Sequence, residues 1–240
     1  MKEYHYKFYS PNLNTETEVL IYGDSGYPVI AFPTSMGKYF QNRDFKLIES
    51  VSHLVDAGKI KIYCVDGEDE MSWYNKVIHP AERVKNHEWY DKFIREEVIP
   101  MAINDTGYSK VCVAGCSFGG YHAANVAFKY PEVVSYLIAM GAGFDIKNQL
   151  DGYYDDHVYY NNPPDFLPGL NHPDLWKMGI ILGTGTEDFC LPQNENLSKI
   201  LKDKNVPHWL DVRPGGIHDW PVWRQMFPDY LSEMLKNNNL

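Results

Sequence analysis

Gly115-Cys116-Ser117-Phe118-Gly119-Gly120 decides how this 240-residue chain is interpreted, because it is a G-x-S-x-G pattern. The segment 110–114 before it contains a short apolar run typical of a buried strand, and the segment 121–129 after it has the small apolar residues of a closely packed helix. A serine on such a turn is exposed above the sheet edge, where the helix N-terminus favours negative charge. We therefore predict that Ser117 is a nucleophile. The alternative is an ordinary strand-turn-helix corner, because the bare pattern also arises by chance.

The composition indicates a globular protein, with 44% hydrophobic and 22% charged residues and a formal net charge of −10. No Lys/Arg run occurs, which argues against nucleic acid or an anionic membrane as partner. Residues 1–10 lack an apolar signal core, and no apolar run is long enough for a membrane span. The four cysteines form no C-x-x-C pair, which favours reduced thiols. We expect a soluble, cytoplasmic protein.

Strand and helix patterns alternate along the chain, which predicts one domain over residues 1–240 with a mostly parallel, doubly wound sheet. The first two strands are predicted to form an antiparallel pair. The predicted strands are 3–9, 17–22, 28–32, 60–65, 110–114, 134–140, 177–182 and 208–212. The predicted helices are 42–55, 87–102, 121–129, 194–202 and 220–235.

The segment 145–174 interrupts this alternation. It is rich in Asn, Asp, Pro and Tyr and has little periodicity. Long segments of this kind in compact domains are usually functional lids or insertions. We predict that 145–174 is a cap over the site.

The residues that follow Ser117 along the chain include candidates for the carboxylate that would orient a base. A serine hydroxyl needs a base that takes its proton and an acid that orients the base. After a turn of this type the acid precedes the base along the chain. Asp188 follows the strand 177–182, so it is predicted at the same sheet edge as Ser117. Asp188 is preferred, and Glu187 is the adjacent alternative.

His218 is the candidate base. It lies between the last strand and the last helix, after two glycines that permit a sharp loop. One helix and one strand separate it from Asp188. His208 is the alternative at a strand start, and His122, inside the helix after the turn, is interpreted as structural.

Two backbone N–H groups are expected to hold the oxyanion. One belongs to Phe118, the residue after the nucleophile. The other comes from the loop Pro33–Gly37, where proline has no N–H, so Thr34, Ser35 or Met36 must donate. Ser35 is preferred.

Aromatic residues gather in polar loops, where they are expected either to line a substrate pocket or to pack a lid. The candidates for substrate contact are Trp73, Tyr74 and Trp220, and His157 and His172 in the cap are further possibilities. The cluster Asp66–Glu70 lacks the spacing of a calcium loop and is interpreted as an acidic loop at the rim. No phosphate-binding or dinucleotide motif occurs, and we expect neither a cofactor nor a metal.

These motifs resemble the putative-esterase group of the α/β-hydrolase superfamily, which includes esterase D-type thioester hydrolases, feruloyl and acetyl esterases and mycolyltransferases. The resemblance covers nearly the whole chain. It rests on the residues 115–120, 72–74, 183–188 and 216–220 with Trp223 behind them. It implies an α/β-hydrolase fold in which Ser117 resembles the nucleophile, Asp188 the acid and His218 the base. Ser35 and Phe118 would correspond to the oxyanion donors, although many members have His-Gly or Asp-Gly where this chain has Pro33-Thr34.

The predicted function is a serine esterase that cleaves small-molecule or sugar-linked carboxylic esters through an acyl-enzyme. An acyltransferase that uses the same acyl-enzyme, a serine peptidase and a catalytically silent binding module are the alternatives. The order Ser, Asp, His along the chain argues against the silent module. The oligomeric state, including a homo-oligomer, stays open.

Overall fold

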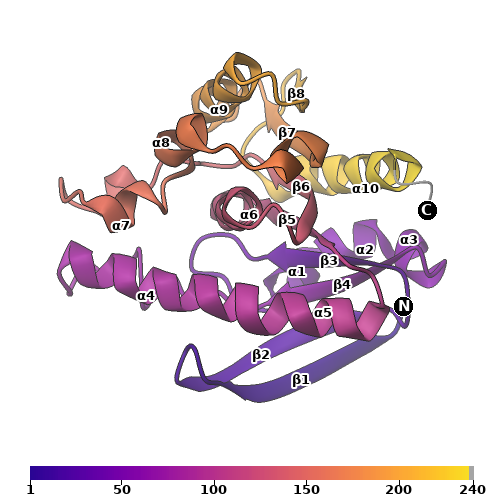
Figure 1. Cartoon of the computed structure of the whole chain (residues 1–240). Helices are drawn as coiled ribbons and strands as arrows, with labels where there is room; N and C mark the ends of the chain where they lie inside the picture. Colours follow the sequence, from indigo (N-terminus) through magenta and orange to yellow (C-terminus); the bar gives the residue numbers. More distant parts are fainter. Residues whose placement is uncertain (238–240) are drawn as a thin grey trace.

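The computed structural model describes residues 1–237, and a single eight-stranded sheet runs through its centre (Figure 1). The strands are β1 (Glu3–Ser10), β2 (Thr15–Tyr22), β3 (Tyr27–Phe32), β4 (Ile60–Val65), β5 (Val111–Cys116), β6 (Val134–Met140), β7 (Gly179–Gly185) and β8 (Trp209–Arg213). Their order is β1-β2-β4-β3-β5-β6-β7-β8. Strands β3 to β8 pair in parallel, whereas β1–β2 and β2–β4 are antiparallel. The predicted mostly parallel sheet with an antiparallel start is confirmed.

Helices cover both faces of this sheet (Figure 1). The side chains of α4, α5, α6 and α9 pack on one face, and those of α2, α3 and α10 pack on the other. The helices are α1 (Gln41–Asp44), α2 (Leu47–Ser50), α3 (Ser52–Asp56), α4 (Pro80–Phe93), α5 (Ile99–Thr106), α6 (Phe118–Lys129), α7 (Asp156–Tyr159), α8 (Pro163–Phe166), α9 (Leu191–Asp203) and α10 (Trp220–Asn237). The molecule is therefore a three-layer sandwich.

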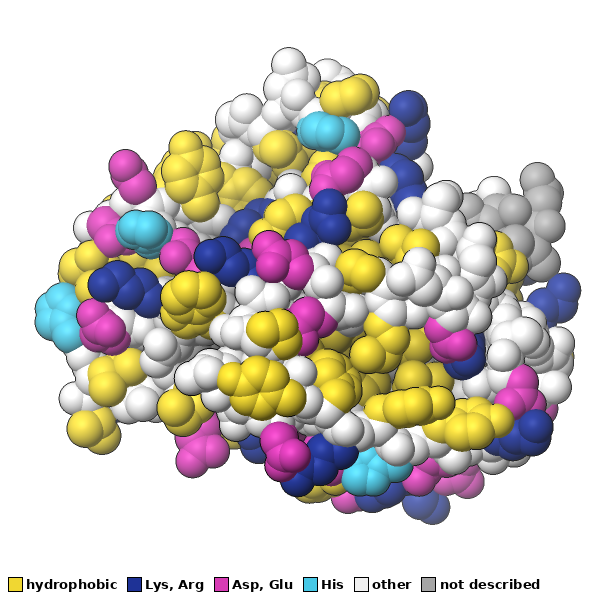
Figure 2. All heavy atoms as spheres, turned by 60° about the horizontal axis from the view of Figure 1, so that its bottom comes forward, with side chains coloured by type: hydrophobic (Ala, Val, Ile, Leu, Met, Phe, Trp, Pro, Cys, Tyr) yellow, Lys and Arg dark blue, Asp and Glu magenta, His cyan; other side chains and the backbone are white. Residues whose placement is uncertain are grey.

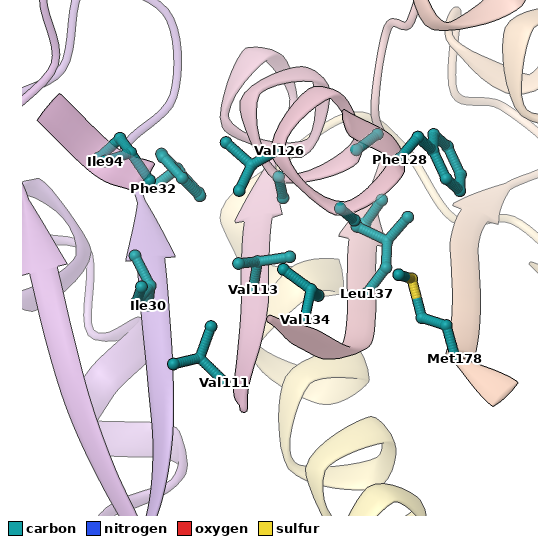
Figure 3. Packing of buried hydrophobic residues seen from close by; sticks show 14 of the residues in the cluster. Ile30, Phe32, Ile94, Val111, Val113, Val126, Phe128, Val134, Leu137 and Met178 are labelled. Atoms are coloured by element: carbon teal, nitrogen blue, oxygen red, sulfur yellow. The ribbon is translucent and has the colours of Figure 1, made fainter. Parts of the chain in front are cut away.

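Strand β5 shows why the sheet needs two covered faces. All of its residues are buried. Val111 and Val113 belong to the core beneath α6, which Figure 3 shows from close by, whereas Cys112 and Ala114 belong to the core on the opposite face. Successive side chains of a strand alternate between faces, so a continuous apolar run is typical of a central parallel strand. Burial of each valine side chain contributes about 1.5–3 kcal/mol.

The predicted helix 42–55 is wrong as a single element, because the chain forms the three short helices α1, α2 and α3 there. Lys46 has a left-handed φ of 63°, and Val51 has φ −116° and ψ 11°. Neither conformation continues a helix. The apolar spacing was nevertheless informative, since Leu47, Ile48 and Val55 are buried against the sheet.

The predicted helix 87–102 is too short at both ends. Helix α4 begins at Pro80, after His79 caps its first turn by accepting a hydrogen bond from the Ala81 N–H. A π-helical turn, Ile94–Val98, connects α4 to α5. The wider turn lies just before Pro100, which lacks the N–H that an α-helix would use there.

The segment 145–174 contains short helices rather than a loop without structure. Helix α7 contacts α4, and α8 contacts α6 and α9. The Arg83 guanidinium donates hydrogen bonds to the Gln149 carbonyl at 2.6 Å and to the Asp151 carboxylate at 2.7 Å, which ties the start of the segment to α4. Its role as a cap stays a prediction.

The surface carries charges of both signs. On the face shown in Figure 2, Lys and Arg side chains lie between Asp and Glu side chains and form no large patch of one sign. All four cysteines are buried and free. Among residues 1–237, no helix combines the length and the apolar character needed to cross a membrane.

Candidate active site

Ser117 lies at the turn between β5 and α6, in the position that the sequence predicts. Its φ of 53° and ψ of −124° are rare for a residue with a side chain, and such strain persists only where the surroundings enforce it. Glycines make the turn possible. A Cβ at Gly115 would lie 2.2 Å from the Gly119 carbonyl carbon, and one at Gly120 would lie 2.4 Å from the Ala142 Cβ. The pattern therefore reflects close packing of strand against helix.

Three side chains from distant loops meet at this turn. The His218 Nε2 atom lies 2.9 Å from the Ser117 Oγ atom, and the His218 Nδ1 atom lies 2.8 Å from Asp188 Oδ1. His218 precedes α10, and Asp188 follows β7. Parallel strands end at one edge of the sheet, which brings the loops after β5, β7 and β8 together.

Asp188 is buried, and its surroundings hold the carboxylate in place. Its Oδ1 atom also accepts a hydrogen bond of 2.8 Å from the Cys190 N–H. Gly141 follows β6 with a φ of 56°, and a Cβ there would lie 2.7 Å from Asp188 Oδ2. A side chain at position 141 would therefore push the carboxylate away from His218. The neighbouring Glu187 is exposed.

Aromatic rings enclose the His218 imidazole. The Trp223 ring meets it edge-on, with centroids 5.0 Å apart, and the Phe189 ring lies 4.1 Å away. The imidazole is 14% exposed, whereas the Phe189 side chain is 75% exposed. The imidazole is thus packed between aromatic rings and still reached from solvent.

The loop after β3 offers one free N–H group near the serine. The Thr34 N–H donates to Gln41 Oε1 at 2.7 Å, and the Met36 N–H donates to Asp69 Oδ2 at 2.9 Å. Within residues 1–237 the Ser35 N–H between them has no acceptor. Phe118 is the first residue of α6, so its N–H has no acceptor within the helix. These two amides are the candidate oxyanion donors.

A pocket of about 240 Å³ opens beside the serine. Tyr74 lines it, and its hydroxyl donates to the Ser35 Oγ atom at 2.9 Å. Its ring meets the Phe118 ring edge-on. The first turn of the segment 145–174 also reaches the pocket. The lining comprises Ser35, Tyr74, Ser117, Phe118, Gly143, Asp145, Asn148, Gln149, Phe189, Cys190 and Gln193.

Several side chains that the sequence singles out lie elsewhere. Trp73 is completely buried, is not among the residues that line the pocket, and packs against the rings of His87 and Tyr121. Trp220 stacks on Phe45 with centroids 4.6 Å apart, also outside the pocket lining. His157 pairs with Glu88 on the surface.

The remaining histidine candidates are occupied away from the serine. The His172 side chain caps the short helix Pro173–Lys177. His208 contacts Ser198 Oγ at 2.7 Å, at the far end of β8 from the loop that carries His218.

Sequence reasoning missed the role of Asp69, which it grouped with the acidic loop Asp66–Glu70. Asp69 is only 2% exposed, and it joins the Met36 N–H to the His122 Nε2 atom, which lies 2.8 Å from Asp69 Oδ1. The available signal was its place after β4, at the same sheet edge as Ser117. His122 is structural, as predicted, in the sense that it is buried beneath the turn.

Asp188, Cys190 and His218 form a group whose ligand atoms lie within 4.8 Å of one another, close enough for a metal ion. Burial raises the pKa of the Cys190 thiol to about 12, so the thiol is protonated at neutral pH unless a bound cation displaces the proton. The two other members already bond each other through His218 Nδ1. The donor set therefore fits a hydrogen-bonded acid and base better than a metal site. The same raised pKa makes Cys190 a poor rival nucleophile.

Comparisons with known proteins agree with this geometry. The model of the Esterase family, described as "Putative esterase", matches residues 10–234. No curated protein sequence matches the chain. Similar solved structures include a ferulic acid esterase, with 18% identity, a TM-score of 0.77 and 96% of both chains covered. An S-formylglutathione hydrolase from Staphylococcus aureus has 15% identity and a TM-score of 0.74, with 98% of both chains covered.

A further similar structure is a fluorophosphonate-binding serine hydrolase from Staphylococcus aureus, with 16% identity, a TM-score of 0.72 and 98% of both chains covered. At these identities the structural likeness establishes the fold. The family match extends over nearly the whole chain and includes every residue of the site. The protein is therefore a member of the putative esterase family, a carboxylic-ester hydrolase with the α/β-hydrolase fold.

Proposed function

We propose that the protein cleaves carboxylic esters through an acyl-enzyme on Ser117, with His218 as base and Asp188 as the acid that orients it. The observation that carries this proposal is the unbroken line of contacts from Ser117 Oγ through both nitrogens of His218 to Asp188 Oδ1. The Asp188 carboxylate accepts a hydrogen bond from the Nδ1–H, which leaves the Nε2 lone pair facing the serine.

The reaction has two halves. The Ser117 oxygen bonds to the ester carbonyl carbon while its proton passes to His218 Nε2. The bond to the alcohol oxygen then breaks, and the same proton passes to the departing alcohol. Water repeats these steps on the acyl-enzyme and releases the acid. The Ser35 and Phe118 N–H groups stabilise the negative oxygen in each tetrahedral intermediate.

The pocket favours a short acyl group. Its volume of about 240 Å³ is below the roughly 300–1,000 Å³ typical of sites for larger ligands. The Tyr74 and Phe118 rings, which contact each other, give the lining an apolar part, and Asn148 and Gln149 give it polar groups. We expect kcat/KM for p-nitrophenyl esters to be highest for acetyl or propionyl and to fall towards octanoyl. A maximum at octanoyl would contradict the short acyl group without affecting the proposed nucleophile.

Replacement of Ser117 tests the proposal directly. The wild-type protein should hydrolyse p-nitrophenyl acetate and become labelled by a fluorophosphonate probe at Ser117. Ser117→Ala should lose both activities and keep its circular dichroism spectrum, because the hydroxyl is hydrogen-bonded only to His218 within residues 1–237. Full labelling of this variant would show that the nucleophile is another residue.

A further inference from the structure

The carboxylate of Asp69 connects three separate parts of the chain at the active site. It lies in the loop after β4 and is almost completely buried. Its Oδ2 atom accepts a hydrogen bond from the Met36 N–H at 2.9 Å, in the loop after β3. Its Oδ1 atom lies 2.8 Å from His122 Nε2, on the helix that begins directly after Ser117. The two candidate oxyanion donors lie on the two segments that Asp69 joins.

The loop that carries Ser35 is strained where Asp69 holds it. Met36 has a left-handed φ of 57°, a conformation that is unfavourable for a residue with a side chain. The Asp69 carboxylate accepts from Met36, and the Gln41 side chain accepts from Thr34. Buried or half-buried side chains thus hold both neighbours of Ser35. Of the N–H groups of residues 34–36, only that of Ser35 has no acceptor within the described residues 1–237.

His122 links Asp69 to helix α6, which begins directly after Ser117. Its imidazole is 3% exposed, and it packs against the Phe118 ring with centroids 5.1 Å apart and against Phe32 at 5.9 Å. Its Nδ1 atom has no hydrogen-bond partner among the described residues, so the Nε2–H to Asp69 is its single polar anchor. A ring held in this way fixes the first turn of α6 relative to the loop after β3.

We propose that Asp69 is a positioning residue, which through Met36 and His122 keeps the Ser35 and Phe118 N–H groups at the separation that the oxyanion requires. This inference rests on the proposed function. It assigns the acidic loop a catalytic purpose although Asp69 does not touch the substrate. Loss of the Asp69 hydrogen bonds to Met36 and His122 lowers the stabilisation of the transition state. It leaves the binding of the ester ground state unchanged.

Asp69→Asn tests this inference, because the amide replaces one of the two carboxylate oxygens, which face Met36 and His122 separately, with an NH2 donor. We expect kcat per active site to fall by roughly 10–100-fold with KM unchanged, since loss of an oxyanion donor outright costs about 10²–10³-fold. Active sites are counted by complete reaction with a fluorophosphonate, so partial unfolding cannot imitate the effect. Inhibition by an alkyl trifluoromethyl ketone, whose adduct with Ser117 carries an oxyanion, should weaken by the same factor.

Asp66→Asn is the matched control. Asp66 lies in the same loop and accepts a hydrogen bond from the Tyr39 N–H at 3.1 Å, whereas the hydrogen bonds from Met36 and His122 go to Asp69. Its kcat and its inhibition by the ketone should equal those of the wild-type protein. A loss equal to that of Asp69→Asn would mean that the loop tolerates no substitution, and the specific role of Asp69 would be rejected.

His122→Phe provides a second route to the same question if Asp69→Asn does not fold. Phenylalanine keeps a ring among the same aromatic neighbours but cannot donate to Asp69. It should reproduce the loss of kcat at constant KM. Wild-type kcat per titrated site in the folded variants would overturn the inference and leave the proposed function intact. A wild-type protein that neither cleaves esters nor reacts with the probe would overturn both.

Discussion

Ser117 and its two partners illustrate how much a single side chain depends on its backbone. The serine is presented by a strained φ, and the imidazole is held between aromatic rings. The Asp188 carboxylate is buried and accepts a second hydrogen bond, from the Cys190 N–H. Each of these features limits the freedom of one reacting group, which is how an active site reduces the entropic cost of the reaction.

Asp188→Asn should lower kcat by on the order of 10³–10⁴-fold, because an amide at this position stabilises the wrong imidazole tautomer. Steady-state kinetics with p-nitrophenyl acetate measure the loss. Glu187→Gln is the matched control, since Glu187 is adjacent but exposed, and its kinetics should be those of the wild-type protein. A large loss of kcat in Glu187→Gln together with wild-type kinetics in Asp188→Asn would identify Glu187 as the acid.

At the scale of elements, the strand-turn-helix unit β5–α6 and the loop after β3 act as one block. Gly119 lies on α6 against this loop, and a Cβ there would lie 2.4 Å from the Pro33 carbonyl oxygen and 2.9 Å from that of Phe32. Helix α6 can therefore approach β3 only where no side chain intervenes.

Gly119→Ala should destabilise the protein by about 1–3 kcal/mol, although alanine favours a helix more than glycine does. The overlap is with backbone atoms, which cannot move aside like a flexible side chain. Urea unfolding followed by circular dichroism measures the change. At Gly169 a Cβ would meet only the Tyr159 hydroxyl at 3.6 Å, so Gly169→Ala should leave the stability nearly unchanged. Equal free energies of unfolding for Gly119→Ala and Gly169→Ala would show that α6 and β3 can move apart at little energetic cost.

At the scale of the whole molecule, the layer between α4 and α6 contains a buried polar cluster behind the site. His87 of α4 is 1% exposed, and its Nε2 atom contacts the Tyr121 hydroxyl at 3.3 Å and the Asn125 amide at 3.2 Å. Burial, and to a smaller extent the neighbouring His122 and Lys129, holds the pKa of His87 well below its usual range. The folded protein therefore keeps His87 neutral.

This depressed pKa makes the stability depend on pH. Below about pH 6.5 the unfolded chain binds a proton at His87 that the folded protein does not, so stability falls as the pH falls. Between pH 7.5 and 5.5 the contribution of His87 is about 1.4 kcal/mol. Urea unfolding at both pH values should show that His87→Gln loses less stability than the wild-type protein. The exposed His53→Gln should behave like the wild-type protein, and an unchanged pH dependence of His87→Gln would contradict the prediction.

Local patterns in the sequence were sufficient to predict the strands and the turn at Ser117. They also indicated that Asp188 and then His218 follow this turn along the chain. Hydrophobic periodicity and glycine positions are properties of neighbouring residues, so they can be recognised without the fold. The prediction of a single helix over 42–55 was wrong because Lys46 adopts a left-handed conformation, which ends a helix. The apolar residues on either side of it nevertheless keep a helical spacing. The residue types around position 46 do not predict that conformation.

Only the tertiary structure decided which side chains face one another across the sheet edge. It placed Asp188 rather than Glu187 against His218 and brought Asp69 against the Met36 N–H in the loop after β3. It also put Tyr74 in the pocket lining and buried Trp73 outside that lining. These choices depend on the twist of the sheet and on how loops from β3, β4, β5, β7 and β8 pack together. Adjacent residues in a loop differ little in sequence environment, yet one can be buried against a partner while the next faces water.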